Sequence, residues 1–159
     1  MKLIIGSDHA GYELKEKIKS YLQTQGEHIE DFGTTTAEAC DYPDVGVKVA
    51  DYVANHADSL GILICGTGVG IGIAANRHRW IRSGVCHDAT TARLTRQHNN
   101  ANVLALGARV LGPEVARECL RKPAVRASIP DRRGAGDRRR GAAEYASNGG
   151  TLACRPEIW

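Results

Sequence analysis

Residues 61–77 combine a predicted strand, a glycine-rich loop and the start of a predicted helix. The stretch reads GILICGTGVGIGIAANR. Its first residues are apolar or small, as in a strand buried on both faces, and they end at Cys65. Glycine then occupies alternate positions from Gly66 to Gly72. A loop of this kind at a helix N-terminus directs several backbone N–H groups to one place, which is how proteins hold phosphates and other anions.

Two reactive side chains stand on this loop, the thiol of Cys65 and the hydroxyl of Thr67. A helix dipole stabilises a thiolate placed near the helix N-terminus, so Cys65 is a candidate reactive group. The glycine spacing matches neither the dinucleotide fingerprint nor the Walker phosphate loop. The alternative for Cys65 is a buried, unreactive side chain of the kind common at strand ends.

Strand-like and helix-like segments alternate along residues 1–122, which we assign to one domain. This alternation predicts an α/β protein, a three-layer α/β/α Rossmann-like fold with a five-stranded parallel sheet in the order 2-1-3-4-5. The predicted strands are 2–6, 28–32, 61–64, 82–86 and 102–106, and the predicted helices are 12–25, 44–57, 71–76, 88–97 and 113–120.

The expected strand order also predicts where a ligand binds. In an open parallel sheet, ligands bind beyond the carboxyl ends of the strands at the point where the strand order reverses. Here that point lies between the first and third strands, which are followed by Ser7-Asp8-His9 and by residues 65–70. An acid, an imidazole, a thiol and an anion-binding loop are therefore expected to face one crevice. The alternatives are a surface role for His9 and a helix-capping role for Asp8.

Composition and charge exclude several classes of function. Residues 1–122 hold 14 basic and 14 acidic side chains, so this part lacks the basic excess expected of a nucleic-acid-binding domain. The five cysteines form no C-x-x-C pair, which argues against a disulfide framework and against a zinc site. No apolar run has the length of a membrane span, and the N-terminus does not resemble a signal peptide. We expect a cytoplasmic protein with no membrane partner.

The character of the chain changes after Lys122. Residues 123–159 form an atypical Arg/Gly/Ala-rich C-terminal tail with 7 basic and 4 acidic side chains and no helical or strand period. By composition this tail is disordered or loosely docked, and a basic arm that contacts nucleic acid is a further alternative. A change of reading frame near residue 119 would also produce such an abrupt loss of pattern.

Four segments together resemble the type B ribose-5-phosphate isomerases, whose family also includes galactose-6-phosphate isomerases. The likeness extends from residue 1 to about residue 118, with no single motif sufficient alone. The segments are GSDHAG at 6–11, DYPD at 41–44, ICGTGVGIGIAAN at 64–76 and RQHNNANVL at 96–104.

The resemblance implies an aldose–ketose isomerase that interconverts D-ribose 5-phosphate and D-ribulose 5-phosphate through an enediolate, a step of the pentose phosphate pathway. Cys65 would be the base, Thr67 would assist proton transfer and His98 would open the sugar ring. Such chemistry needs a base, donors for the enediolate and a ring-opening group, but no metal and no other cofactor. The substrate-binding residues that the resemblance implies are Asp8, His9, Gly66, Thr67, Gly68, Val69, Gly70, Asn99, Arg109 and Arg132.

Other functions remain open within this resemblance. The substrate could be a related 6-phosphate sugar, either allose 6-phosphate or galactose 6-phosphate. The chain could also be a non-catalytic anion-binding module on the same fold. The family's second phosphate arginine has no counterpart here, because ungapped extension places Gly136 at its position.

The predicted topology has a consequence for the assembly. Cys65 ends a strand, whereas His98 ends a helix that runs back antiparallel to the strands. The two side chains are therefore expected at opposite edges of the sheet. If both are catalytic, His98 must come from a neighbouring chain, and we expect a homodimer, or a dimer of dimers, with active sites shared between subunits.

Overall fold

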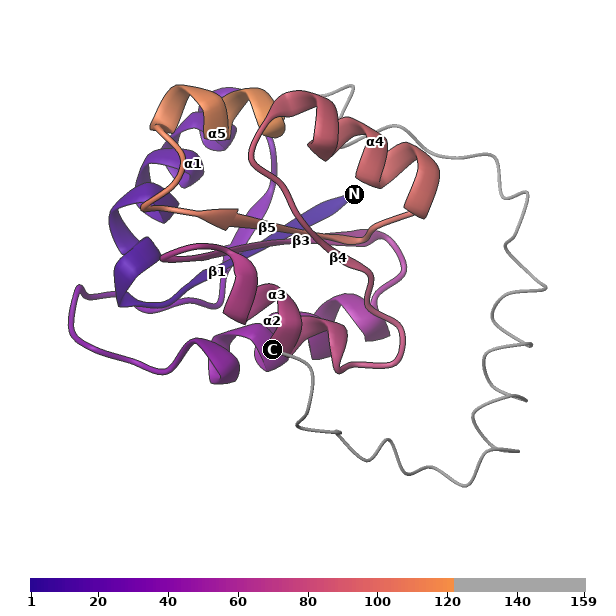
Figure 1. Cartoon of the computed structure of the whole chain (residues 1–159), viewed down its shortest axis with the longest axis horizontal. Coiled ribbons are helices and arrows are strands. Elements are labelled where there is room, and N and C mark those ends of the chain that lie inside the picture. Colours follow the sequence, from indigo (N-terminus) through magenta and orange to yellow (C-terminus); the bar gives the residue numbers. More distant parts are fainter. Residues whose placement is uncertain (122–159) are drawn as a thin grey trace, which may run out of the picture. The chain divides into compact units, whose positions relative to one another are not determined.

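The computed structural model describes residues 1–121, which form a parallel sheet between two layers of helices (Figure 1). A short 3-10 helix, η1, precedes the first α-helix. In chain order the elements are β1 (Lys2–Ser7), η1 (His9–Gly11), α1 (Tyr12–Thr24), β2 (Ile29–Asp31), α2 (Tyr42–Asn55), β3 (Ser59–Cys65), α3 (Val69–Asn76), β4 (Ser83–Val85), α4 (Ala89–Asn99), β5 (Val103–Gly107) and α5 (Pro113–Cys119). Predictions that fall on residues 123–159, including the one for Arg132, lie outside the described part.

The strands pair in parallel throughout, in the order β2-β1-β3-β5-β4. The predicted α/β/α class and the β2-β1-β3 neighbourhood are confirmed, but the expected order of the last two strands is wrong. β5 pairs with β3, and β4 forms the edge. Burial explains this order, because four of the five β5 residues are buried, whereas β4 has only three residues and all are half-exposed. A longer apolar strand buries more apolar surface in the interior of the sheet than at its edge, and this burial stabilises the fold.

Two hydrophobic clusters fill the space on the two faces of the sheet. Ile62 and Ile64 pack with side chains of α1, α4 and α5, while Leu63 and Cys65 pack with side chains of α2 and α3. This alternation follows from the two-residue period of a strand. Cys65 therefore directs its thiol to the α2–α3 side at the carboxyl end of β3.

Several helix starts agree with the sequence, whereas α2 and α3 each begin two residues earlier than predicted. The Asp88 side chain accepts a hydrogen bond from the Thr91 N–H at 2.8 Å, which confirms the predicted cap of α4. Asp8 caps η1 by accepting from the Gly11 N–H at 3.0 Å. Helix α2 begins at Tyr42, two residues before its predicted start, because Pro43 is tolerated in a first helical turn, where its missing N–H has no partner to lose.

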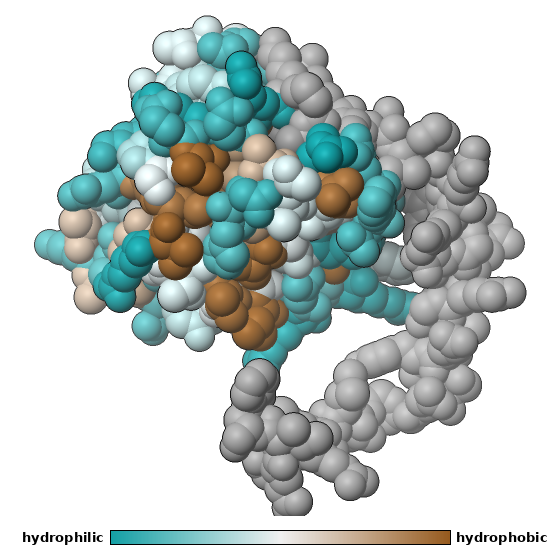
Figure 2. All heavy atoms as spheres, turned by 45° about the horizontal axis from the view of Figure 1, so that its top comes forward, coloured by the Kyte–Doolittle hydropathy of each residue, from teal (hydrophilic) through white to brown (hydrophobic). Residues whose placement is uncertain are grey.

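Large hydrophobic side chains also remain exposed on the described part of the chain. On the face drawn in Figure 2, hydrophobic areas in brown lie among hydrophilic ones in teal. None of the helices within residues 1–121 combines the length and the apolar character that crossing a membrane requires. The exposed large hydrophobic residues are Met1, Tyr42, Val47, Val69, Ile73, Trp80, Val110 and Val115.

Candidate active site

Two loops meet at the carboxyl ends of β1 and β3, where the strand order reverses. Ser7 and Ile64 are register partners in the two strands. The N–H of Asp8 donates to the Ile64 carbonyl at 3.3 Å, and the residue is only 5% exposed. The loop that begins with Asp8 therefore lies directly beside the one that begins with Cys65. The structure brings these two loops together as the sequence predicts.

The thiol of Cys65 lies beneath the turn of the glycine loop. The residue is buried, and its Sγ accepts a hydrogen bond from the Gly68 N–H at 3.1 Å. Gly68 has a φ of 81°, and a Cβ at this position would lie 2.9 Å from the carbonyl carbon of Leu106. Glycine is therefore required for the turn that aims this N–H at the sulphur. The sulphur therefore lies against the N-cap residue of α3.

The glycine loop also lies against the end of β5 and the residues that follow it. A Cβ on Gly107 would come within 2.6 Å of the Thr67 carbonyl oxygen, so the two backbones touch. The Arg109 N–H donates to the Gly66 carbonyl at 2.9 Å, and a Cβ on Gly66 would lie 3.6 Å from the Arg109 guanidinium carbon. Arg109 thus places a positive charge beside the predicted anion-binding loop. The predicted role of Arg109 in substrate binding stays a prediction.

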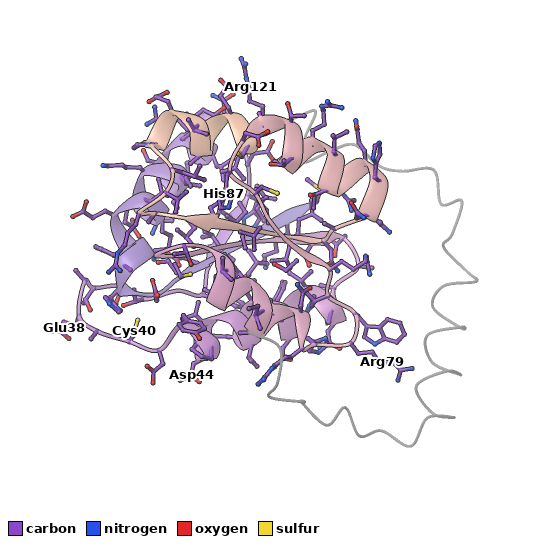
Figure 3. All side chains as sticks on the ribbon, viewed as in Figure 1. Glu38, Cys40, Asp44, Arg79, His87 and Arg121 are labelled. Carbon is purple, nitrogen blue, oxygen red and sulfur yellow. The ribbon has the colours of Figure 1, made fainter. Side chains whose placement is uncertain are left out.

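The polar side chains of the two loops differ in their hydrogen bonds. Thr67 is exposed, and its hydroxyl oxygen accepts from the Val69 N–H at 3.3 Å. His9 is exposed, with its Nδ1 3.3 Å from the backbone N and O of Cys40. Figure 3 shows Cys40 in the loop before α2, on the side of the sheet where the strands end. His9 therefore lies beside the loop before α2, and Thr67 lies on the glycine loop itself.

Tyr42 is a rim residue that the prediction omits from the site. A Cβ on Gly70 would lie 2.9 Å from two carbon atoms of the Tyr42 ring. The ring therefore rests on the first turn of α3, and 41% of the residue is exposed. The resemblance includes Tyr42 in a motif without a role, and nothing in the sequence alone predicts its contact with Gly70. That contact arises from the packing of α2 on α3.

His98 and Asn99 lie at the opposite edge of the sheet from Cys65. Both are exposed at the end of α4, which Figure 1 shows ending where β5 begins. The Arg96 side chain donates to the Ala101 carbonyl at 2.9 Å, in the turn between α4 and β5. In the β3–β5 register, the start of β5 pairs with Gly61 and its end pairs with Cys65. Four residues of strand correspond to about 13 Å, so one chain does not bring His98 to the thiol.

No group of three or more histidine, cysteine, aspartate or glutamate side chains within residues 1–121 is arranged to hold a metal ion. The cysteines of this part of the chain, Cys40, Cys65, Cys86 and Cys119, are all free thiols.

Comparison with known proteins identifies the family of this fold and crevice. Residues 3–123 match the family model described as Ribose/Galactose Isomerase. Ribose-5-phosphate isomerase B of Escherichia coli is 48% identical over 116 residues, which cover 73% of this chain and 78% of that protein. D-erythrulose-4-phosphate isomerase of Pectobacterium atrosepticum is 43% identical over 121 residues, which cover 76% of this chain and 80% of that protein.

Solved structures agree with this match. Ribose-5-phosphate isomerase B of Thermotoga maritima aligns with a TM-score of 0.78 and 44% identity, covering 89% of this chain and 95% of that one. The Mycoplasma genitalium enzyme, solved with bound ribulose-5-phosphate, aligns with a TM-score of 0.79 and 36% identity, covering 94% and 97%. The chain belongs to the ribose/galactose isomerase family.

Proposed function

We propose that this chain is an aldose–ketose isomerase that interconverts D-ribose 5-phosphate and D-ribulose 5-phosphate, with residues 1–122 as its isomerase domain. The observation that carries the proposal is the Gly68 N–H···Sγ hydrogen bond to Cys65, 3.1 Å long, at the crevice of a sugar-phosphate isomerase fold. Relatives with identities of 48% and 36% are named as ribose-5-phosphate isomerases. Family membership and a hydrogen-bonded thiol at the predicted position support the same reaction.

The proposed reaction moves one proton between two carbons. In the direction from aldose to ketose, the Cys65 thiolate takes the proton from C2 of the open-chain sugar, and negative charge develops on the carbonyl oxygen at C1. The backbone N–H groups of residues 66–70 and the N-terminus of α3 stabilise this enediolate. The thiol then returns the proton to C1, while Thr67 passes the hydroxyl proton from the oxygen at C2 to the oxygen at C1.

Side chains around the crevice are proposed to orient the sugar. One carboxylate oxygen of Asp8 is occupied by the Gly11 N–H, and the other is assigned to a sugar hydroxyl. His9 and Arg109 are assigned to the substrate and its phosphate. His9 belongs to the loop after β1, and the Arg109 side chain lies beside Gly66 of the glycine loop. Arg132 is proposed as a further phosphate ligand on the resemblance alone, since it lies outside the described residues.

The ring-opening group is proposed to come from a second copy of the chain. His98 and Asn99 are exposed at the edge of the sheet opposite Cys65, so a site containing all three requires two chains. Val69 and Ile73 lie one turn apart on α3 and are 47% and 57% exposed. Exposed apolar side chains beside a site favour burial against a partner. A two-fold homodimer with two shared sites is the smallest closed assembly that meets both conditions.

An isomerase assay on the purified chain tests the proposal. Ketose formation from ribose 5-phosphate is expected, and its loss in Cys65→Ser would tie it to the thiol. Allose 6-phosphate, galactose 6-phosphate and erythrulose 4-phosphate belong in the same assay, because the family spans ribose and galactose enzymes and one relative is named for erythrulose 4-phosphate. A folded protein with no turnover on any of these sugars would refute the proposal in favour of a non-catalytic anion-binding module.

A further inference from the structure

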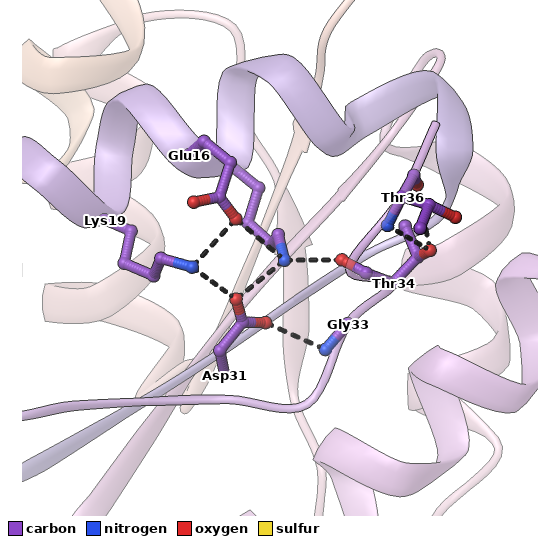
Figure 4. Close-up of polar contacts among 7 residues, drawn as sticks. Glu16, Lys19, Asp31, Gly33, Thr34 and Thr36 are labelled. Atoms are coloured by element: carbon purple, nitrogen blue, oxygen red, sulfur yellow. Dashed lines mark hydrogen bonds and ion pairs between the residues drawn. The ribbon is translucent and has the colours of Figure 1, made fainter. Parts of the chain in front are cut away.

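Lys15 is a charged residue that is completely buried near the start of α1. Its ammonium donates to Asp31 Oδ2 at 2.7 Å and to the Thr34 carbonyl at 2.7 Å (Figure 4). It also lies 3.1 Å from Glu16 Oε1 and 5.5 Å from the centre of the Tyr12 ring. The ammonium therefore joins α1 to the end of β2 and to the loop that follows β2.

Stability alone does not account for a lysine at this position. Removal of an ammonium from water is costly, and its ion pairs commonly do no more than offset that cost. A hydrophobic side chain of similar volume is often as stabilising in such a place. An apolar residue could not donate the hydrogen bond to the Thr34 carbonyl. The role of Lys15 therefore depends on the segment that this bond holds in place.

Thr34 and Gly33 connect this bond to the crevice. The Thr34 N–H donates to the Ser7 carbonyl at 3.0 Å, so its backbone is held by Lys15 on one side and by Ser7 on the other. The Gly33 N–H donates to Asp31 Oδ1 at 3.0 Å, and a Cβ on Gly33 would lie only 2.4 Å from the Ser7 nitrogen. Ser7 directly precedes Asp8. The start of the loop is therefore packed against the backbone that carries Asp8.

The other end of the same loop contacts His9. The backbone N and O of Cys40 each lie 3.3 Å from His9 Nδ1. We infer that Lys15 is a positioning residue, which fixes the segment 33–40 (the clamp segment) and thereby holds Asp8 and His9 in place for the substrate. This inference rests on the proposed function to the extent that Asp8 and His9 contact the sugar phosphate.

Lys19 provides a matched control on the same helix. Its ammonium donates to the same two oxygens, Asp31 Oδ2 and Glu16 Oε1, at 2.8 Å each, and no bond from it to Thr34 is present. Lys15→Met and Lys19→Met therefore each remove one cation from the same carboxylates. Only Lys15→Met also releases the Thr34 carbonyl.

The first test is steady-state kinetics with ribose 5-phosphate. Lys15→Met is expected to lower kcat/KM by roughly 10- to 100-fold, because small displacements of positioning groups have effects of that size. The loss should fall mainly on KM, since Asp8 and His9 are assigned to substrate binding and not to proton transfer. Lys19→Met should remain within about twofold of the parent, as expected for a partly exposed ion pair. Equal losses in the two variants would overturn the inference.

The second test does not depend on activity. Amide hydrogen exchange, followed by mass spectrometry, should become faster across the clamp segment in Lys15→Met and stay unchanged in Lys19→Met. An inactive parent protein would refute the proposed function, yet this comparison would still decide the role of Lys15. Unchanged exchange of the clamp segment in Lys15→Met would show that the lysine does not hold it.

A double variant keeps the test usable if Lys15→Met alone does not fold. Lys15→Met leaves Asp31 with one cationic partner fewer, so Lys15→Met combined with Asp31→Asn keeps the local charge balanced. The double variant should fold and still show the weaker substrate binding and the faster exchange. If neither variant folds, Lys15 is required for the fold itself and the positioning role is refuted.

Discussion

The Gly68 N–H donates to the Sγ of Cys65 over 3.1 Å, across a turn in which Gly68 has a φ of 81°. This bond joins the residue proposed as the base to the loop proposed to hold the enediolate. The donor is the N-cap residue of α3, so the proposed base lies at the N-terminus of that helix. The base and the oxyanion donors therefore depend on the same few backbone atoms.

Replacement of Cys65 by serine should remove most of the turnover and keep the fold. The volume change is small, but a serine hydroxyl is a far weaker base at neutral pH, and general acid–base catalysis contributes on the order of 10²–10⁴-fold. Ketose formation from ribose 5-phosphate measures the loss. Cys40→Ser is the control, because Cys40 is a half-exposed free thiol outside the proposed base position. A Cys65→Ser rate within about threefold of the parent would remove the thiol from the mechanism.

Replacement of Gly68 by alanine should lower kcat as well as the free energy of unfolding. Gly68 and Gly26 both have positive φ, 81° and 73°. A Cβ on Gly68 would lie 2.9 Å from the carbonyl carbon of Leu106, whereas nothing lies within 4 Å of a Cβ on Gly26. Each alanine should cost about 1–2 kcal/mol of the free energy of unfolding through its φ. Only Gly68→Ala should also displace the N–H from the sulphur and lower kcat.

Unfolding in urea and ketose formation, measured on Gly68→Ala and Gly26→Ala, separate these effects. The Gly26 variant should lose stability alone. Equal activity in the two folded variants would mean that the Gly68 turn has no part in catalysis.

Acid stability should depend on Asp31. Burial alone would raise the pKa of this carboxyl, but hydrogen bonds from Lys15, Lys19 and the Gly33 N–H outweigh burial and hold the pKa below its usual value. A lowered pKa in the folded state stabilises the fold above the unfolded pKa of about 3.9, and this stabilisation is lost as the pH falls through the folded value.

The urea midpoint of the parent should therefore fall more steeply below about pH 4 than the midpoint of Asp31→Asn, which has no proton to gain there. Parallel curves for the parent and Asp31→Asn would show that the ion pairs do not lower this pKa.

Sequence patterns predicted the elements better than their contacts. The apolar run before Cys65 and the alternate glycines predicted a buried strand followed by a loop and a helix, since both depend on local periodicity. The positions of β4 and β5 were not predictable in this way, because order across a sheet depends on competition for the interior. The Lys15–Thr34 bond and the contact of Tyr42 with Gly70 join residues far apart in sequence, so no local pattern indicates them.

The last prediction concerns the shared site. Cys65 ends β3, while His98 lies at the edge where β5 begins, so a subunit cannot bring the two together by itself. Cys65→Ala chains and His98→Ala chains should each form nearly inactive homodimers. In a mixed dimer one site holds both lesions, and the other combines an intact Cys65 with an intact His98. Random two-fold pairing makes half of the dimers mixed, each with one working site, so co-expression should restore roughly a quarter of the parent activity. Mixed dimers as inactive as the two homodimers would refute the shared site.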